Sequence, residues 1–148
     1  MGSYLFPTLL IIIVSLKQSA GRCGHGRVEY GGKCYWFVKE PKTFFDALMV
    51  AYRARCQLLE LQNKKEQWWL DLYLRLQGMN SVWLGFTDIQ KEGHWIALSN
   101  RTKMTYSSWK RGEPNNAGGK EHCAVYTTEA LGWIDYNCTG KLQFVCKY

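Results

Sequence analysis

Glu113-Pro114-Asn115-Asn116 precedes Glu121-His122-Cys123 in this chain, and Trp133-Ile134-Asp135-Tyr136-Asn137-Cys138 follows further downstream. These stretches place carboxylates and carboxamides in neighbouring loops, beside two cysteines that could tie the loops together. Calcium takes about six to eight oxygen ligands and accepts carboxylates, side-chain amides and backbone carbonyls. The pattern therefore predicts binding assisted by calcium, and not catalysis.

The N-terminal segment differs in composition from the rest of the chain. Residues 4–16 are almost wholly apolar, and the small residues Ser19, Ala20 and Gly21 follow them. This run is shorter than the roughly 20 residues that a membrane-spanning helix needs, so residues 1–20 are interpreted as a secretory signal peptide. An uncleaved anchor and a buried apolar strand are the alternatives. On the favoured interpretation the domain at residues 21–148 is secreted and extracellular, with no membrane span.

The remaining residues suffice for one domain with a core of its own. Trp, Tyr and Phe make up 22 of the 148 residues, so large rings can build that core. All six cysteines follow the apolar segment, and an even number in a secreted chain suggests disulfide bonds, although the spacing alone selects no pairing. The formal charge of +7 comes from dispersed basic residues, which indicates solvated surface and no nucleic-acid site.

Two helices are predicted in the first half of the domain, after a hairpin over residues 23–38. The first helix begins at Thr43 as N-cap with Asp46 three residues on. Its apolar residues recur at helical spacing: Phe44, Ala47, Leu48, Ala51 and Tyr52. The second helix covers residues 65–76 and ends before Gly78. Its expected buried stripe consists of Trp68, Trp69, Leu72 and Leu76.

The second half of the domain alternates short strands with long loops. Strands are predicted at residues 82–86, 95–97, 123–126 and 143–146. Residues 98–132 carry many Ser, Thr, Asn, Gly and Lys residues with little periodicity, which indicates loops of functional use. Without an internal repeat or a linker, a single α+β domain is the economical prediction.

Six short motifs follow one another along the chain: Cys34-Tyr35-Trp36-Phe37, Trp83-Leu84-Gly85-Phe86, Glu113-Pro114-Asn115, Cys123, Trp133-x-Asp135-x-x-Cys138 and Phe144-Val145-Cys146. Each motif alone is weak. Their order and spacing over residues 23–148 resemble the C-type lectin-like domain. The resemblance implies an α+β, C-type lectin-like fold with two helices, small antiparallel sheets and a long calcium-binding loop region.

The resemblance also implies a disulfide pattern. It pairs Cys123 with Cys138, Cys23 with Cys34 in an N-terminal hairpin, and Cys56 with Cys146. The family usually has a cysteine at the position of Ala51, so either the first helix runs on to Cys56 or this cysteine lies beyond its end.

By the same resemblance, one calcium ion is held by Glu113, Asn115, Glu121 and Asp135, with Pro114 in a cis peptide bond. The family's order Glu-Pro-Asn implies equatorial 3- and 4-hydroxyls, hence mannose, glucose, N-acetylglucosamine or fucose on microbial or host cell surfaces, as in innate immunity. A fifth ligand is missing, because Ile134 stands where the family has Asn. The auxiliary calcium site of some members maps to Asp88, Glu92, Asn116 and His122, where two carboxylates are lost, so a second ion is not expected.

These residues are open to other interpretations. Glu113-Pro114-Asn115-Asn116 could be a plain turn, and Ile134 favours a calcium-independent member of the fold that binds a protein partner, as in venom or saliva. An enzyme is disfavoured, because His25, His94 and His122 show no spacing typical of a zinc pair or of a nucleophile and base. Of the two N-glycosylation sequons, at Asn100 and Asn137, only Asn100 is expected to be used.

Overall fold

The computed structural model describes residues 22–148, and the predicted signal peptide at residues 1–20 lies outside this range. The described part contains two helices, α1 (Phe44–Arg53) and α2 (Lys64–Gln77), and a 3-10 turn, η1 (Ala117–Gly119). Its strands are β1 (Val28–Tyr30), β2 (Lys33–Lys42), β3 (Gln57–Leu58), β4 (Ser81–Thr87), β5 (Ile96–Ala97), β6 (Thr102–Lys103), β7 (Cys123–Thr127), β8 (Gly132–Tyr136) and β9 (Leu142–Lys147). The predicted α+β fold is confirmed.

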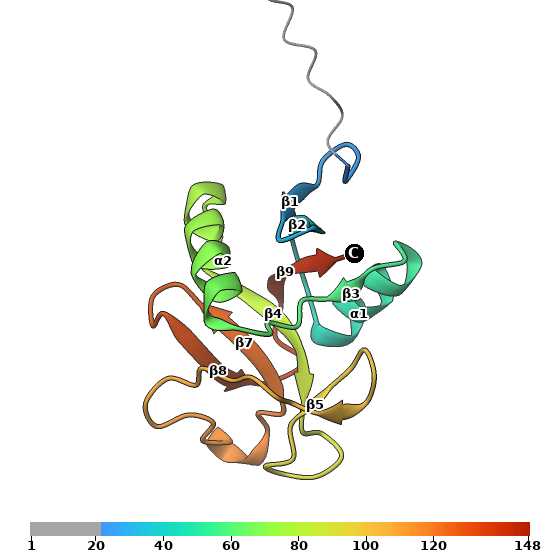
Figure 1. Cartoon of the computed structure of the whole chain (residues 1–148). Helices are drawn as coiled ribbons and strands as arrows, with labels where there is room; N and C mark the ends of the chain where they lie inside the picture. The colour runs from blue at the N-terminus through green and yellow to red at the C-terminus, as the bar shows by residue number, and fades with distance from the viewer. Residues whose placement is uncertain (1–21) are drawn as a thin grey trace, which may run out of the picture.

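The strands form one branched sheet in which β4 and β9 are central. The main path runs β1-β2-β9-β4-β5-β6, while β7 pairs with both β4 and β8. β9 pairs antiparallel with β2 and parallel with β4, which joins the two halves of the chain. In Figure 1, α1 and α2 lie on opposite sides of these strands, and the long loops between β4 and β7 extend from the end remote from β1.

The N-terminal hairpin depends on two consecutive glycines. Gly31 and Gly32 have positive φ angles of 57° and 75° and join β1 to β2. A two-residue turn that matches the twist of its strands needs positive φ at both central positions, which glycine adopts without steric cost. The disulfide between Cys23 and Cys34 then fixes the segment before the hairpin to β2.

Helix α1 begins as the sequence predicts but buries fewer of its residues. The Thr43 side chain accepts a hydrogen bond from the Asp46 backbone N–H, as expected for the N-cap. Phe44, Ala47 and Ala51 are buried. Tyr52, which follows the same helical spacing in the sequence, is not part of the buried face, because its side chain is 79% exposed. Tyr52 lies one residue, about 100° of helix rotation, beyond the inward face at Ala51.

Helix α2 presents a different face to the core from the predicted one. Its buried residues are Glu66, Gln67, Leu70 and Leu74. The predicted stripe is wrong, because Trp68, Leu72 and Leu76 are between 60% and 71% exposed, and only Trp69 packs against the core. The apolar pattern failed because two inward positions of the helix are polar.

Those two polar residues are satisfied by buried hydrogen bonds. Gln67 Oε1 accepts from Trp133 Nε1 at 2.9 Å. Glu66 Oε1 accepts from the Tyr35 hydroxyl at 2.6 Å and pairs with Lys147 Nζ at 2.5 Å. Burial alone would raise the pKa of Glu66, but the bonds from Lys147, Tyr35 and the Gln62 backbone bring it below its ordinary value. The ammonium of Lys147 therefore compensates the charge of this buried carboxylate.

The disulfide bonds join Cys23 to Cys34, Cys56 to Cys146 and Cys123 to Cys138, the same three pairings that the resemblance implies. Helix α1 ends at Arg53, and Arg55 adopts a positive φ of 55° before Cys56. The chain thus turns out of the helix first, so Cys56 lies beyond its end and next to β3.

One strand near the site was not predicted. β8 pairs antiparallel with β7 over five residues, from Gly132 opposite Thr127 to Tyr136 opposite Cys123. Trp133 and Asp135 alternate with Ile134 along it, so both of these side chains point to one face and both are buried. The strand therefore anchors Asp135 to the aromatic core through Trp133.

Candidate functional site

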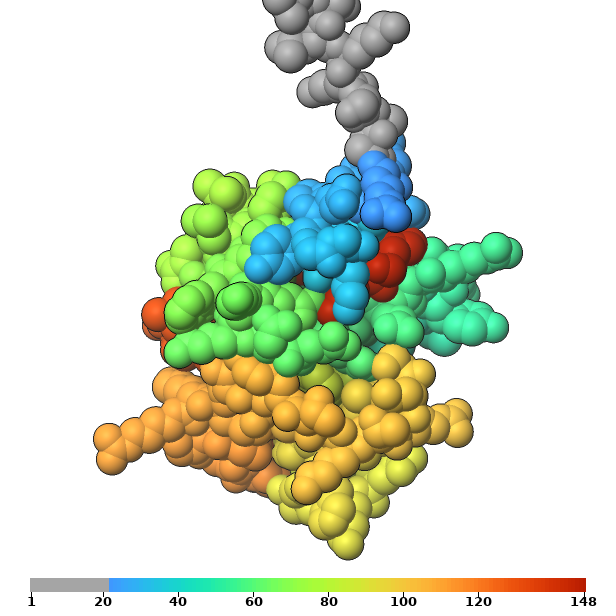
Figure 2. Space-filling view, in the orientation of Figure 1, coloured from blue at the N-terminus to red at the C-terminus, as the bar shows by residue number. Residues whose placement is uncertain are grey.

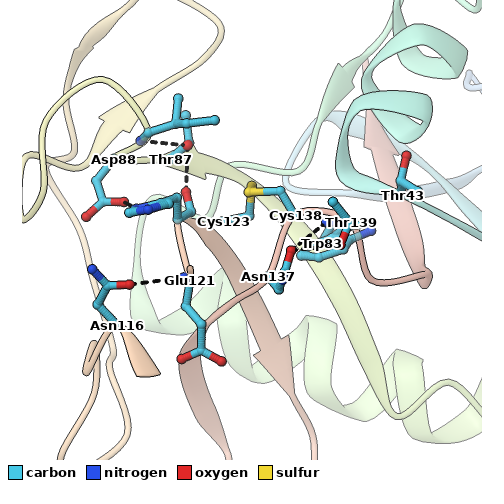
Figure 3. Close-up of a disulfide and its surroundings, with 12 residues drawn as sticks. Thr43, Trp83, Thr87, Asp88, Asn116, Glu121, Cys123, Asn137, Cys138 and Thr139 are labelled. Carbon is cyan, nitrogen blue, oxygen red and sulfur yellow. Dashed lines mark hydrogen bonds and ion pairs between the residues drawn. A yellow bond between two sulfur atoms is a disulfide. The ribbon is translucent and has the colours of Figure 1, made fainter. Parts of the chain in front are cut away.

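Three segments carry the four predicted ligands. Glu113 and Asn115 come from the loop before η1, Glu121 from the residues just before β7, and Asp135 from β8. The disulfide between Cys123 and Cys138 ties the start of β7 to the chain after β8. In Figure 3 Asn116 and Glu121 lie on one side of this bond, with Asn137 on the other. The disulfide therefore holds two of the three segments together.

Asp135 organises the loop that carries Glu113 and Asn115. Its Oδ1 accepts from the Asn115 backbone N–H at 3.0 Å, and its Oδ2 accepts from the Asn116 backbone N–H at 2.7 Å. The peptide bond between Glu113 and Pro114 is cis. Asn115 Nδ2 donates to Glu113 Oε1 at 2.9 Å, so Asn115 Oδ1 is the amide atom that remains for a cation. Glu113, Asn115 and Asp135 thus form one linked group.

Glu121 joins this group through the turn that follows Asn116. Its Oε2 accepts from the Ala117 backbone N–H at 3.0 Å, and its own backbone N–H donates to Asn116 Oδ1 at 3.0 Å. Figure 3 shows the Glu121 carboxylate extending away from Asp88. The turn at residues 116–121 therefore connects Glu121 to the loop that carries Glu113 and Asn115.

The group carries three carboxylates without a compensating cation. Burial, the neighbouring Asp135 and the charge of Glu121 raise the pKa of Glu113 to about 7. Glu113 Oε2 is buried and has no hydrogen-bond partner. Within residues 22–148, no Lys or Arg forms an ion pair with any of the three. Because a buried unpaired charge is costly, this oxygen-rich set fits a hard divalent cation such as calcium.

Ile134 contributes no oxygen to this group. It lies opposite Val125 in the β7–β8 ladder, and its half-buried side chain packs against a core cluster that includes Cys123 and Cys138. Water, a sugar hydroxyl or the Asp135 carbonyl would have to fill the coordination position that an Asn side chain would occupy.

A second polar cluster lies beside the first, at the positions of the auxiliary site. His122 Nδ1 is 3.0 Å from Asp88 Oδ1 and 3.5 Å from Glu92 Oε2. Asp88 Oδ2 also accepts from the Gly93 backbone N–H at 2.8 Å, and Asn116 Nδ2 donates to Glu92. The imidazole thus contacts both carboxylates, and one possible ligand atom from each of the three residues lies within 4.8 Å of the other two. The absence of a second calcium ion stays a prediction.

Of the remaining predicted features, the Asn100 sequon lies in an exposed loop between β5 and β6. Asn100 Oδ1 accepts from both the backbone N–H and the hydroxyl of Thr102. Asn137 makes the same contacts with Thr139 but is half-buried beside the disulfide of Cys138. Glycosylation at Asn100 stays a prediction. Neither helix within residues 22–148 has the length and apolarity required to cross a bilayer.

The chain is similar to known proteins over nearly its whole length. Residues 40–148 match the family described as the Lectin C-type domain. A C-type lectin of Micrurus corallinus is 30% identical over 99% of this chain and 98% of its own length. Among solved structures, the carbohydrate-recognition domain of mouse scavenger receptor C-type lectin superposes with a TM-score of 0.79 at 29% identity, over 85% of this chain and 97% of that one.

A second solved structure is the cow C-type carbohydrate-recognition domain of CD23, crystallised in the presence of a GlcNAc2Man3 oligosaccharide. It superposes with a TM-score of 0.76 at 27% identity, over 85% of this chain and 95% of that one. The family match, the similarity to the Micrurus corallinus lectin and the shared fold agree with the motifs and the disulfides. The chain therefore belongs to the C-type lectin family, whose members are non-enzymatic carbohydrate-binding proteins.

Proposed function

We propose that this domain binds mannose-type glycans, that is those presenting mannose, glucose, N-acetylglucosamine or fucose, through one calcium ion held by Glu113, Asn115, Glu121 and Asp135. The observation that carries the proposal is the hydrogen-bonded group of Glu113, Asn115 and Asp135, in which one Glu113 oxygen is buried without a partner and the charge of Glu121 is near enough to raise the pKa of Glu113. When bound, calcium would offer its remaining coordination positions to two vicinal sugar hydroxyls.

The side chains of Glu113 and Asn115 would determine which sugars bind. Asn115 Nδ2 is a donor and the Glu113 carboxylate an acceptor, and the two lie side by side at 2.9 Å. Of two sugar hydroxyls that bind here, one must accept a hydrogen bond from Asn115 and the other must donate one to Glu113. Because Asp135 holds the backbone at Asn115 and Asn116, that donor and acceptor are fixed in position before a sugar arrives.

The relatives support this assignment in part. The CD23 domain was crystallised in the presence of an oligosaccharide that contains mannose. The apolar residues 4–16 support secretion through a signal peptide at residues 1–20, and an extracellular position would supply calcium at the concentrations that weak modules require. Single sites of this kind bind weakly, so arrayed glycans on a microbial or host surface would be the effective ligands.

Calcium-dependent retention of the purified, disulfide-bonded protein on mannose resin tests the proposal. Retention with calcium and release by a chelator are expected. Glu113→Gln should abolish retention, because it removes a charged ligand at the unpartnered oxygen. Glu29→Gln, at an exposed position of β1, is the matched control and should be retained like the wild type. Retention that a chelator leaves unchanged would exclude the calcium mechanism.

A second candidate function is calcium-independent binding of a protein partner. Two observations favour it: Ile134 removes a ligand, and α2 exposes the large apolar side chains of Trp68, Leu72 and Leu76. On this alternative, calcium would leave the melting temperature unchanged. A rise in melting temperature with calcium that disappears in Glu113→Gln would exclude it.

A further inference from the structure

A groove of about 610 Å³ opens directly beside the proposed calcium site. The residues that matter for its chemistry are Trp95, Ile96, Lys103, Met104, Trp109 and Pro114. Pro114 stands between the predicted ligands Glu113 and Asn115, so the groove begins within one residue of both. In the lower half of Figure 2 the yellow and orange parts of the chain lie against each other, and the lining residues of the groove come from these two parts.

The groove is built on rigid elements. The Trp95 and Trp109 rings lie 4.8 Å apart between centroids, and Trp109 lies 5.6 Å from Trp133, which is fully buried. The other wall segment is held by β5–β6 pairing, with Ile96 opposite Lys103, and by the Met104 backbone N–H donating to the Trp95 carbonyl at 3.0 Å. Because its aromatic residues are anchored in the core, the groove exists before a ligand arrives.

The lining is mainly apolar, with His94 and Lys103 as its polar side chains besides the two indoles. Trp95 is only 6% exposed, and its indole Nε1 is buried without a hydrogen-bond partner. Buried polar groups nearly always have such a partner, so this N–H is an exception that needs an explanation. Ile96, Met104 and Pro114 offer carbon surface only. A ligand group that matches these carbon surfaces would be apolar.

We propose that this groove binds the apolar aglycone, an acyl or aryl group, of a glycan whose sugar occupies the calcium site. The inference rests on the proposed function, because the sugar positions the aglycone. A second sugar is a poorer occupant, since its hydroxyls need several polar partners and the polar side chains of the lining, besides the two indoles, are His94 and Lys103.

Comparing the Kd values of methyl, p-nitrophenyl and octyl α-mannoside in calcium tests the inference. We expect the two apolar glycosides to bind about tenfold more tightly than the methyl glycoside, which corresponds to about 1.4 kcal/mol. Met104→Glu should bring this ratio close to one, because it places a charge in the groove. Met49→Glu, at an exposed position of α1, is the control and should keep the ratio.

A second measurement separates this inference from the proposed function. The indole N–H resonance of Trp95, assigned by its loss in Trp95→Phe, should shift when p-nitrophenol is titrated into the protein without calcium or sugar. If methyl mannoside fails to bind and the resonance still shifts, the calcium-site function is wrong and the groove stands. A ratio near one without a shift would overturn the groove. An advantage for mannobiose equal to that of the aryl glycoside would also overturn it, in favour of a second sugar.

Discussion

Two clusters in this domain each contain a glutamate shielded from water, and the pKa values of the two glutamates are shifted in opposite directions. Glu66 meets the ammonium of Lys147, the hydroxyl of Tyr35 and a backbone N–H, and its pKa falls below the ordinary value despite burial. Glu113 meets two further carboxylates and one amide, and its pKa rises to about 7. The first cluster is complete and serves stability. The second pairs with no Lys or Arg of residues 22–148, and it is the group to which we assign the proposed calcium ion.

The largest effect is expected when the Glu66 cluster loses its cation. Lys147→Met leaves Glu66 buried without its cation, and losing one partner of a buried pair costs about 3–5 kcal/mol. Urea denaturation should show this loss equally with and without calcium. Lys141→Met, at an exposed position before β9, is the control and should cost less than about 0.5 kcal/mol. An equally small loss for Lys147→Met would mean that the two clusters do not differ as described.

Calcium bound at the Glu113 cluster should increase the stability of the domain. At a calcium concentration one hundred times its Kd, the ion should raise the free energy of unfolding of the wild type by about 2.7 kcal/mol. Glu113→Gln should lose this gain, whereas Lys147→Met should keep it. Thermal unfolding with calcium or chelator measures both. A gain that survives in Glu113→Gln would place the ion elsewhere.

Adding the missing ligand to the Glu113 cluster should strengthen calcium binding. Ile134→Asn adds a carboxamide where the ligand is missing, and calcium should bind about tenfold more tightly, equivalent to about 1.4 kcal/mol. Ile134→Leu keeps the side chain apolar and should leave the affinity unchanged. Calorimetric titration of both variants makes the comparison, and equal affinities would show that residue 134 does not face the ion.

The smallest effect concerns the neighbouring cluster, in which His122 Nδ1 contacts both Asp88 and Glu92. His122→Asp replaces the imidazole by a third carboxylate. This cluster would then consist of three carboxylates without a positively charged partner, like the Glu113 cluster. Calorimetry should then show two calcium ions per chain in place of one. The calcium-free variant should be less stable by about 1 kcal/mol because of repulsion between like charges. A stoichiometry that stays at one would mean that the imidazole is not what excludes the ion.

The sequence predicted those parts of the molecule that depend on local chemistry. The N-cap at Thr43, the C-terminal Gly78 of α2 and the central strand β4 follow from residue type and spacing. The ligand group at Glu113 could be proposed because its members stand in recognisable motifs. The calcium itself stays a prediction, since its binding depends on how Ile134 is compensated.

What could not be predicted depends on contacts between distant residues. The inward face of α2 is set by Glu66 and Gln67, whose partners Lys147 and Trp133 lie 81 and 66 residues away in the chain. Strand β8 exists because β7 offers it a ladder, although its own five residues show no strong alternation. The groove beside Pro114 arises where two loops meet, and no stretch of sequence encodes such a space.

The pairing of β2 with β9 determines how the domain can be attached to other objects. The Tyr148 backbone N–H donates to the Cys34 carbonyl at 2.8 Å, so the last residue lies against the N-terminal hairpin, at the end of the molecule remote from the long loops (Figure 1). A biotin or a fluorophore coupled through Tyr148 would consequently leave those loops facing outward. Surfaces coated in this way would present every copy in the same orientation, which suits glycan arrays and measurements of avidity.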